Sequence, residues 1–320
     1  MKTYLITGGA GFIGSTLSEK LLSMGHKVIA VDNFNNFYNP DIKRNNIKEA
    51  LKNPNFKLEE IDIRDEKEMT RVFDENKVDT VMHLAAMAGV RPSIENPLLY
   101  QQVNVGGAQV LFEVIRNHNV KNLVFASSSS VYGNNKSVPF KETDIVDFAI
   151  SPYAATKKSN EVMGHVYHSL YSINMAFLRF FTVYGPRQRP DLAINKFTRL
   201  ILNDEEIPMF GDGSTSRDYT YIDDIIDGII KAINWVESNT NVYEIFNIGE
   251  STPIKLTQMI EAIELAVGKK AKIKQLPMQS GDVNQTYADI TKAKTILGYN
   301  PTTSFNDGID KFVDWYLKDK

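Results

Sequence analysis

The sequence predicts an α/β protein in which a doubly wound, Rossmann-type parallel sheet is joined to a smaller α/β substrate domain. Short, unbroken apolar runs alternate with longer amphipathic segments through residues 1–180, and a glycine-rich turn follows the first run. Strands that are apolar throughout are typical of parallel sheets, because the crossover helices bury both faces. Right-handed crossovers then give the doubly wound arrangement.

The elements of this region can be placed in chain order. The expected strands are short and hydrophobic: Tyr4–Thr7, Lys27–Val31, Phe56–Ile61, Thr80–Leu84, Asn122–Ala126 and Met175–Arg179. The helical spacing of apolar residues predicts the segments between them: Phe12–Met24, Asp65–Asn76, Pro97–Asn117 and Pro152–Tyr171. The last helix has the clearest start, because Ser151 is a favoured N-cap and Pro152 suits the first helical position.

Two domains are expected, one over residues 1–180 and one over residues 181–320. Beyond residue 185 the alternation becomes irregular, although a helix near Asp223–Asn234 and a helix near Leu256–Val267 are still indicated. We expect the second domain to interleave with the first, with a strand at Tyr243–Ile248 returning to the main sheet.

Charge and composition narrow the function classes. The chain has 36 basic and 39 acidic residues, so a net charge of −3 without charged blocks gives no support for binding nucleic acid or a membrane surface. The absence of cysteine excludes disulfides, a thiol nucleophile and a thiolate metal site. The five histidines are scattered, and no signal-peptide core or transmembrane-length apolar run occurs. We therefore expect a cytoplasmic protein with no metal.

The first apolar run leads into a G-x-x-G-x-x-G segment with glycines at Gly8, Gly11 and Gly14. Glycines at such a turn let the backbone approach a pyrophosphate. Phe12 and Ile13 begin the following helix, and the free N–H groups of its first turn point at the pyrophosphate oxygens. A plain tight turn is the structural alternative, but a strand before the segment and a helix after it favour dinucleotide binding.

Asp32, at the end of the second strand, extends this interpretation. It follows Gly14 by 18 residues, where a carboxylate can accept both adenosine ribose hydroxyls of NAD and repel a 2′-phosphate. With no arginine at hand to hold that phosphate, NAD is the expected cofactor. A strand-end cap is the alternative role for Asp32.

Further cofactor contacts are expected at the ends of neighbouring strands, where an adenine and a ribose would pass. These candidates are Asn33, Asp62, Ile63, Leu84, Ala85 and Ala86. Small alanines there suggest a backbone close to a ligand, although ordinary strand-to-helix packing would look the same.

A Y-x-x-x-K spacing is typical of a tyrosine acid/base with a lysine neighbour, and about one is expected by chance in this composition. The chain has three, so the spacing alone does not identify a site: Tyr132/Lys136, Tyr153/Lys157 and Tyr316/Lys320. Only the second pair lies in a predicted helix with a clear start, where both side chains share one face. The first pair is separated by turn-forming residues, and the third is at the chain end. A lysine ammonium beside a phenol lowers the pKa of the phenol, which suits acid/base catalysis.

Serines follow the fifth strand, at Ser127–Ser130. Hydroxyls at the carboxyl end of a parallel strand point into the ligand crevice. A solvated loop would have the same composition.

Several of these segments together resemble the extended short-chain dehydrogenase/reductases that act on nucleotide sugars. The resemblance rests on Thr7–Gly14 (TGGAGFIG), Asp32, the serine run with VYG, Tyr153–Lys157 (YAATK) and Arg179–Pro186 (RFFTVYGP). Narrower segments are most similar to UDP-glucuronate 4-epimerases: Asp32–Tyr38 with Lys43 and Arg44, Ala88–Pro97, and Gly213–Tyr221.

The resemblance implies roles for individual residues. Tyr153 is the acid/base, Lys157 tunes it and holds the nicotinamide ribose, and Asn104 lies near the cofactor. Ser128 matches the family's serine, and its neighbours Ser129 and Ser130 stay open as alternatives.

On the substrate side, the resemblance makes residues 181–320 the nucleotide-sugar-binding domain. Thr182, a substrate candidate, stands where many UDP-galactose 4-epimerases have asparagine, and Arg217 stands where the family's arginine meets the pyrophosphate. Gln279, ahead of the substrate candidate Asp282, replaces a second pyrophosphate arginine of related epimerases, which leaves Arg187 and Arg189 as substitutes.

The activity implied is that of an isomerase: a UDP-sugar 4-epimerase, homodimeric, that interconverts UDP-glucuronate and UDP-galacturonate by transient C4 oxidation with bound NAD. Related 4,6-dehydratases carry an acidic pair, and related decarboxylases a glutamate, at the places that Ser129 and Ser130 occupy here. The alternatives are a UDP-glucose or UDP-N-acetylglucosamine 4-epimerase, or a non-catalytic NAD-binding regulator of the same fold.

Overall fold

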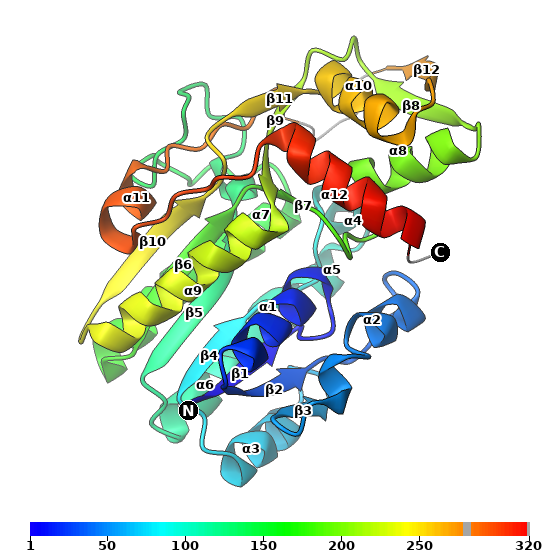
Figure 1. The fold of residues 1–320 in the computed structure, drawn as a ribbon. Helices are drawn as coiled ribbons and strands as arrows, with labels where there is room; N and C mark the ends of the chain where they lie inside the picture. The colour runs from blue at the N-terminus through cyan, green and yellow to red at the C-terminus, as the bar shows by residue number, and fades with distance from the viewer. Residues whose placement is uncertain (278–282, 319–320) are drawn as a thin grey trace. The chain divides into compact units, whose positions relative to one another are not determined.

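A seven-stranded sheet is the centre of the computed structural model, which describes residues 1–277 and 283–318 (Figure 1). The strand order is β10-β6-β5-β4-β1-β2-β3, and the pairs that β1 forms with β2 and β4 are parallel, as are β2–β3 and β4–β5. The strands are β1 Thr3–Thr7, β2 Lys27–Val31, β3 Phe56–Glu59, β4 Thr80–His83, β5 Asn122–Ser128, β6 Asn174–Phe180 and β10 Tyr243–Ile248. The predicted doubly wound α/β fold is confirmed.

Helices cover both faces of this sheet. Their bounds are α1 Phe12–Ser23, α2 Pro40–Asn46, α3 Glu66–Glu75, α4 Val90–Glu95, α5 Pro97–Tyr100, α6 Gly107–Asn117, α7 Pro152–Tyr171 and α9 Ile222–Ser238. Apolar side chains of α3, α6 and α7 pack with β1, β4 and β5 in one buried cluster, whereas α1 and α9 lie in front of the strands in Figure 1. Among the described residues, none of the helices has the length and apolar character needed to cross a bilayer.

The start of α7 agrees with the sequence prediction. Ser151 Oγ accepts a hydrogen bond from the Ala154 N–H at 3.2 Å, and Pro152 occupies the first helical position. The serine therefore caps the helix that carries Tyr153 and Lys157, and fixes where that helix begins.

The predicted helical segment Pro97–Asn117 is helical throughout, but it is not a regular α-helix over its whole length. Between α5 and α6 the chain forms a wider π-helical segment, Gln101–Gly106, with Asn104 buried inside it. The Asn104 carbonyl oxygen accepts from the Asn160 side chain at 2.8 Å, and its own side chain binds both backbone groups of Met87 at 2.8 and 3.0 Å. These tertiary hydrogen bonds accompany the widened turn, a feature that apolar periodicity cannot report.

The chain divides into two units that interleave along the sequence. The first comprises Met1–Gly133, Ile145–Arg179 and Ile226–Phe246, and the second Asn134–Asp144, Phe180–Ile225 and Asn247–Lys320. Strand β10 begins in the first unit and ends in the second. The chain passes from one unit to the other several times, so a single cut at residue 180 does not describe its path.

The second unit is built from small sheets and helices. A three-stranded sheet has the order β11-β9-β7, with β7 parallel and β11 antiparallel to β9, and β12 pairs in parallel with β8. The bounds are β7 Thr182–Tyr184, α8 Ala193–Leu202, β8 Glu206–Phe210, β9 Ser216–Tyr221, β11 Pro253–Lys255, α10 Leu256–Val267, β12 Lys272–Leu276, α11 Thr291–Leu297 and α12 Phe305–Lys318. Strands this short have little periodicity, which is why most were not predicted.

A buried carboxylate holds three segments of this unit together. Asp218, on β9, accepts hydrogen bonds from the backbone N–H groups of Glu250, Ser251 and Ala288 at 2.8 to 3.0 Å. Burial raises the pKa of Asp218 to about 6, although these hydrogen bonds oppose the shift. Glu250 Oε2 is buried without a hydrogen bond, and burial next to Asp224 and Asp218 raises the pKa of Glu250 to about 8.

These two acids predict a stability that falls as pH rises. A carboxyl with a raised pKa binds a proton in the folded chain that the unfolded chain has released, so unfolding becomes easier as pH increases toward the folded pKa. The free energy of unfolding should therefore decrease between about pH 5 and about pH 8. The measurement is urea denaturation across this range.

Glu250→Gln should flatten that dependence, because glutamine carries no proton that can be lost. The matched control is Glu261→Gln, which changes an exposed glutamate on α10 and should leave the slope with pH as in the wild type. Equal slopes in wild type and Glu250→Gln would contradict the assignment.

Candidate active site

The glycine-rich turn joins the ends of β1, β2 and β4 to the start of α1. Gly8 has a φ of +69°, and its N–H donates to the Val31 carbonyl at 2.7 Å. A Cβ added at Gly14 would stand 2.2 Å from the Gly8 carbonyl oxygen, and one at Gly8 would stand 2.9 Å from the Ala85 nitrogen. Only glycine allows the chain segments to approach this closely.

The start of α1 is suited to an anion. Gly11 is its N-cap and provides no side-chain hydrogen bond to the first turn, which contains buried Phe12 and half-buried Ile13. The partial positive charge at a helix N-terminus favours phosphate oxygens. The turn and the helix start together fit the pyrophosphate of a dinucleotide.

Asp32, at the end of β2, is nearly buried, and its carboxylate is held from several sides. It accepts hydrogen bonds from the Ala10 N–H at 3.2 Å and the Phe34 N–H at 2.9 Å. Lys43 Nζ, on α2, lies 3.1 Å from Asp32 Oδ1. Nothing in the sequence pattern predicted that Lys43 would pair with Asp32, since the two residues are 11 positions apart and lie on different elements.

Asp62 is fixed by two side chains. Asn33 Nδ2 donates to it at 2.9 Å, and Arg64 binds both carboxylate oxygens, at 2.9 and 2.7 Å. The Arg64 hydrogen bonds lower the pKa of Asp62 to about 2 although burial opposes the shift. The neighbouring Ile63 side chain is buried against Gly107, where an added Cβ would stand 2.6 Å from Ile63 Cδ1.

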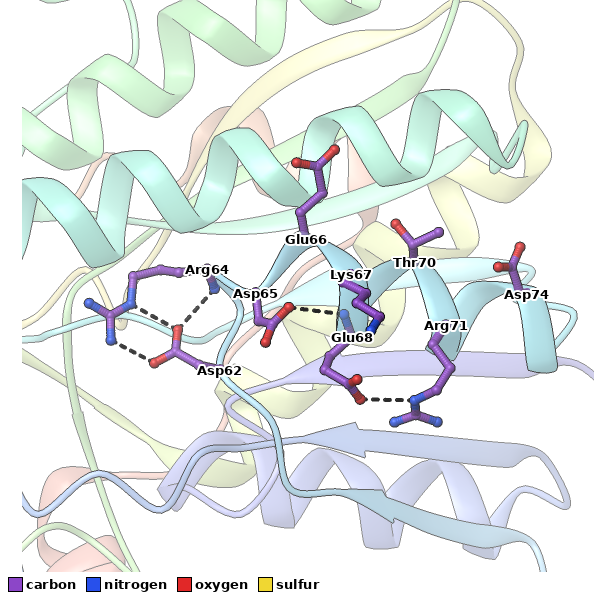
Figure 2. Close-up of a pocket in the computed structure, with 9 residues that line it drawn as sticks. All are labelled: Asp62, Arg64, Asp65, Glu66, Lys67, Glu68, Thr70, Arg71 and Asp74. Carbon is purple, nitrogen blue, oxygen red and sulfur yellow. Dashed lines mark hydrogen bonds and ion pairs between the residues drawn. The ribbon is translucent and has the colours of Figure 1, made fainter.

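Figure 2 shows Asp62 and Arg64 at one end of a surface hollow of about 1100 Å³ that continues along α3. Its lining is polar and charged: Asp62, Arg64, Asp65, Glu66, Lys67, Glu68, Thr70, Arg71 and Asp74. The charges pair with one another, as in Arg71 with Glu68 at 2.9 Å. None of the predicted catalytic residues lines it, so we do not regard this hollow as the catalytic site.

The end of β4 lies against the glycine turn. The Leu84 N–H donates to the Thr7 carbonyl at 3.1 Å, and the Ala85 N–H to Thr7 Oγ1 at 3.2 Å. Leu84, Ala85 and Ala86 are each half-buried. The backbone of Ala85 thus lies close to Gly8, where an added Cβ would stand 2.9 Å from the Ala85 nitrogen.

Asn104 is buried next to α7. Besides binding the Met87 backbone, its Nδ2 donates to Thr156 Oγ1 at 3.1 Å. The side chain thus ties the segment after β4 to the helix that carries Tyr153 and Lys157.

Tyr153 and Lys157 lie together on α7. Lys157 is 3% exposed and donates from Nζ to the Ala126 carbonyl at 2.7 Å, and its Nζ lies 5.8 Å from the centre of the Tyr153 ring. Burial lowers the pKa of Lys157 to about 8, and the Glu161 carboxylate opposes this shift. A protonated amine is therefore held against the end of β5, beside a half-buried phenol.

The serine run divides at the end of β5. Ser127 faces inward and donates to Glu161 Oε1 at 2.7 Å, whereas Ser128 Oγ accepts from the Ser130 N–H at 3.2 Å and donates to Ser130 Oγ at 3.1 Å. Ser129 and Ser130 begin a short 3-10 helix, Ser129–Tyr132. Ser128, Ser129 and Ser130 thus lie together at the strand end, whereas Ser127 is buried and bonded to Glu161.

The other two Y-x-x-x-K pairs are placed differently. Tyr132 is buried and its hydroxyl accepts from Arg179 Nη1 at 3.0 Å, while Lys136 is exposed on a loop. Tyr316 lies in α12, and Lys320 is outside the described residues. Context, not spacing, separates Tyr153/Lys157 from these pairs.

Among the predicted substrate residues, Ser128, Ser129 and Ser130 belong to the first unit, whereas Thr182, Arg187, Arg189 and Arg217 belong to the second. Thr182 on β7 pairs in register with Tyr219 on β9, the strand that also carries Arg217. Arg217 is half-buried and its Nη1 donates to the Ser216 carbonyl at 2.9 Å.

The two arginines considered for a phosphate clamp lie in the loop after β7. Arg187 has a φ of +68°, and Arg189 forms a two-point ion pair with Asp191 at 3.0 and 2.7 Å. Gln279 and Asp282 are outside the described residues. Within residues 1–277 and 283–318, no three acidic or histidine side chains gather as metal ligands would.

Comparison with known proteins agrees with this geometry. A family model described as GDP-mannose 4,6 dehydratase matches residues 5–312. A UDP-glucuronate 4-epimerase from Thermodesulfobacterium geofontis is 43% identical and covers 98% of this chain and 96% of its own length.

Solved structures show the same similarity. The UDP-glucuronic acid 4-epimerase of Bacillus cereus, in complex with UDP-glucuronic acid and NAD, aligns with a TM-score of 0.93 at 36% identity, over 99% of this chain and 100% of that one. The UDP-glucose 4-epimerase of Thermotoga maritima, with UDP-glucose, aligns with a TM-score of 0.90 at 35% identity, over 99% of both chains. The chain therefore belongs to the extended short-chain dehydrogenase/reductase family that the GDP-mannose 4,6 dehydratase model represents.

Proposed function

We propose that this protein is an isomerase, an NAD-dependent UDP-sugar 4-epimerase that interconverts UDP-glucuronate and UDP-galacturonate. The observation that carries the proposal is the placement of Tyr153 beside the buried Lys157 ammonium, at the strand end that bears Ser128–Ser130. The relatives named UDP-glucuronate 4-epimerase, which align over almost the whole chain, support the reaction and the substrate.

The first unit fits NAD. The pyrophosphate would be held by the glycine turn and the start of α1, and the adenosine ribose by Asp32 with Lys43. Asn33, Asp62, Ile63 and Leu84–Ala86 border the path of the adenine. When bound, NAD supplies a hydride acceptor and donor for C4 of the sugar.

The residues of this chain transfer the proton of the C4 hydroxyl. Tyr153, as phenolate, removes the proton of the C4 hydroxyl during oxidation and returns it during reduction. The Lys157 ammonium stabilises that phenolate electrostatically and holds the nicotinamide ribose. Ser128, with Ser129 and Ser130 beside it, donates hydrogen bonds to the sugar oxygen that becomes a carbonyl.

The side chains at the end of β5 argue against elimination, although the matching family model is named for a dehydratase. Loss of water requires an acid and a base beside the sugar, and the segment Ser127–Gly133 contains no carboxylate. Hydroxyl groups alone can orient a 4-keto sugar without promoting loss of water or of carbon dioxide.

We assign the nucleotide end to the second unit. Arg217 would bind the pyrophosphate, because a guanidinium grips phosphate oxygens at two points, with Arg187 or Arg189 as the second phosphate contact. Asp282 stays a proposed substrate residue without a role at the phosphates. Thr182 would hydrogen-bond the sugar or its carboxylate. Firm binding of the nucleotide and loose binding of the sugar let the ketone turn so that either face can be reduced.

We also propose a homodimer that works in the cytoplasm, where NAD and nucleotide sugars are supplied. Val162, Val166 and Leu170 are 55, 41 and 65% exposed and follow one another at four-residue spacing on α7, so they form an apolar stripe on one face of the helix. Leu98, on α5, is 76% exposed, and α5 packs beside α7. A second copy of the chain would bury this stripe.

Incubation with a panel of UDP-sugars tests the activity. UDP-glucuronate should give UDP-galacturonate with little UDP-pentose, and the nucleotide released from the purified protein should be NAD. Chromatography of the products and mass spectrometry of the nucleotide are the measurements. Conversion of UDP-glucose alone would identify a neutral-sugar epimerase, and bound NAD without any conversion would identify the non-catalytic regulator.

Tyr153→Phe should lower kcat by at least ~10²-fold, because an acid/base group is lost, while nucleotide content stays close to that of the wild type. The matched control is Tyr132→Phe, which removes a hydroxyl bonded to buried Arg179. This control should reduce stability by about 1–3 kcal/mol and lower kcat much less. Similar losses of kcat per folded molecule in both variants would contradict the assignment of Tyr153.

Val166→Glu should convert the dimer into a monomer, because two buried carboxylates would face each other in the interface. The control is Leu265→Glu, which changes a side chain that is 80% exposed on α10. Light scattering should give twice 36.1 kDa for the wild type and the control. A monomeric wild type would rule out the dimer.

A further inference from the structure

A buried ion pair lies beneath the predicted catalytic residues. Arg179 at the end of β6 and Glu161 on α7 each have a side chain that is 1% exposed, and two nitrogens of the guanidinium bind the two carboxylate oxygens at 2.9 Å. Removing two charges from water costs several kcal/mol for each ion, and apolar side chains of similar size would often serve stability as well. Stability alone therefore does not account for this pair.

The pair is joined to the parts of the unit that carry the predicted site. Ser127, one residue before Ser128, donates to Glu161 Oε1 at 2.7 Å, and the third guanidinium nitrogen donates to the Tyr132 hydroxyl at 3.0 Å. Tyr243, on β10, donates to the Glu161 carbonyl at 2.7 Å. Glu161 therefore fixes the end of β5, the short helix after it and α7 with respect to one another.

Glu161 also acts on Lys157, one turn earlier on the same helix. Its carboxylate raises the pKa of Lys157, against the burial that lowers it to about 8. The other groups that face Lys157 are Tyr153 on α7 and His83 on β4, together with the Phe125 ring and the Ala126 carbonyl on β5.

His83 does not titrate in the working range. Burial, and to a lesser extent the charge of Lys157, lower the pKa of this histidine to about 3, and its Nδ1 lies 2.7 Å from Thr7 Oγ1. It is therefore neutral at the pH values where Lys157 changes charge. Glu161 is left as the charged partner of the lysine.

We propose that Glu161, held by Arg179, is a positioning residue of the active site that keeps the Lys157 ammonium charged in its buried place and sets the serine end of β5. The inference rests on the proposed function, since it assigns a task to Lys157. Glu161 reaches neither sugar nor cofactor in this role, because its oxygens are occupied by Arg179 and Ser127, with the Lys158 ammonium 3.7 Å from Oε2.

The test replaces both charges at once, so that Arg179 is not left as a buried ion without its carboxylate partner. In the double variant Glu161→Gln/Arg179→Gln, Lys157 should lose its proton at lower pH. The alkaline midpoints of NAD⁺ affinity and of kcat/KM should both fall by roughly one pH unit, the size expected for loss of a nearby opposite charge. After the bound nucleotide has been removed, calorimetric titration with NAD⁺ between about pH 6 and about pH 10 measures the affinity without any turnover.

Arg179→Lys is the matched control. This variant keeps a cation beside Glu161 but loses the paired hydrogen bonds to both carboxylate oxygens and the hydrogen bond to Tyr132. The melting temperature should therefore fall, while the alkaline midpoints of NAD⁺ affinity and of kcat/KM stay at the wild-type pH. If the Gln/Gln variant does not fold, Glu161→Met/Arg179→Met removes the same charges with apolar side chains. A folded double variant with wild-type midpoints would overturn the inference, as would a wild-type NAD⁺ affinity that is constant across the range.

The affinity profile separates the two proposals. A wild-type protein that binds NAD⁺ but converts no UDP-sugar would refute the epimerase, while the shift in the alkaline midpoint of binding would still decide the role of Glu161.

Discussion

The close approach of Gly14 to the carbonyl of Gly8 is the constraint on which the nucleotide-binding end depends. A side chain at either position would collide with backbone, at 2.2 Å for Gly14 and 2.9 Å for Gly8. Because the turn is this tight, α1 can start at the end of β1. The segment after β4 lies against Gly8, and Asp32 accepts a hydrogen bond from the N–H of Ala10 in the same turn. A helix start and a carboxylate meet there, which is what a dinucleotide requires.

Charge burial follows a common pattern across the first unit. Lys157 bonds to a backbone carbonyl and is influenced by Glu161, Glu161 is paired with Arg179, and Asp32 is paired with Lys43. Each charge withdrawn from water has a partner, because an isolated one would be neutralised or would destabilise the fold. The charges are therefore available to act on bound groups without rearrangement, which is the preorganisation that acid/base chemistry needs.

The family and the reaction are determined by different residues. The glycine turn, Asp32 and the Tyr153/Lys157 pair place the chain in a family whose matching model is described as a dehydratase, and relatives named epimerases align equally completely. In the function that we propose, the choice between such reactions lies in a few side chains at the end of β5, where serines stand and carboxylates are absent. The fold supplies the site, and those side chains supply the chemistry.

Local patterns in the sequence determined the parallel sheet, the glycine turn, the serine cap of α7 and the shared face of Tyr153 and Lys157, because each depends on neighbours within a few residues. Tertiary structure alone decided the rest. Lys43 reaches Asp32 from α2, and Asn104 sits in a π-helical turn bound to distant backbone. Ser127 donates to Glu161, whereas Ser128 does not. These contacts join segments far apart in the chain, and no periodicity or spacing in the sequence encodes which of them meet.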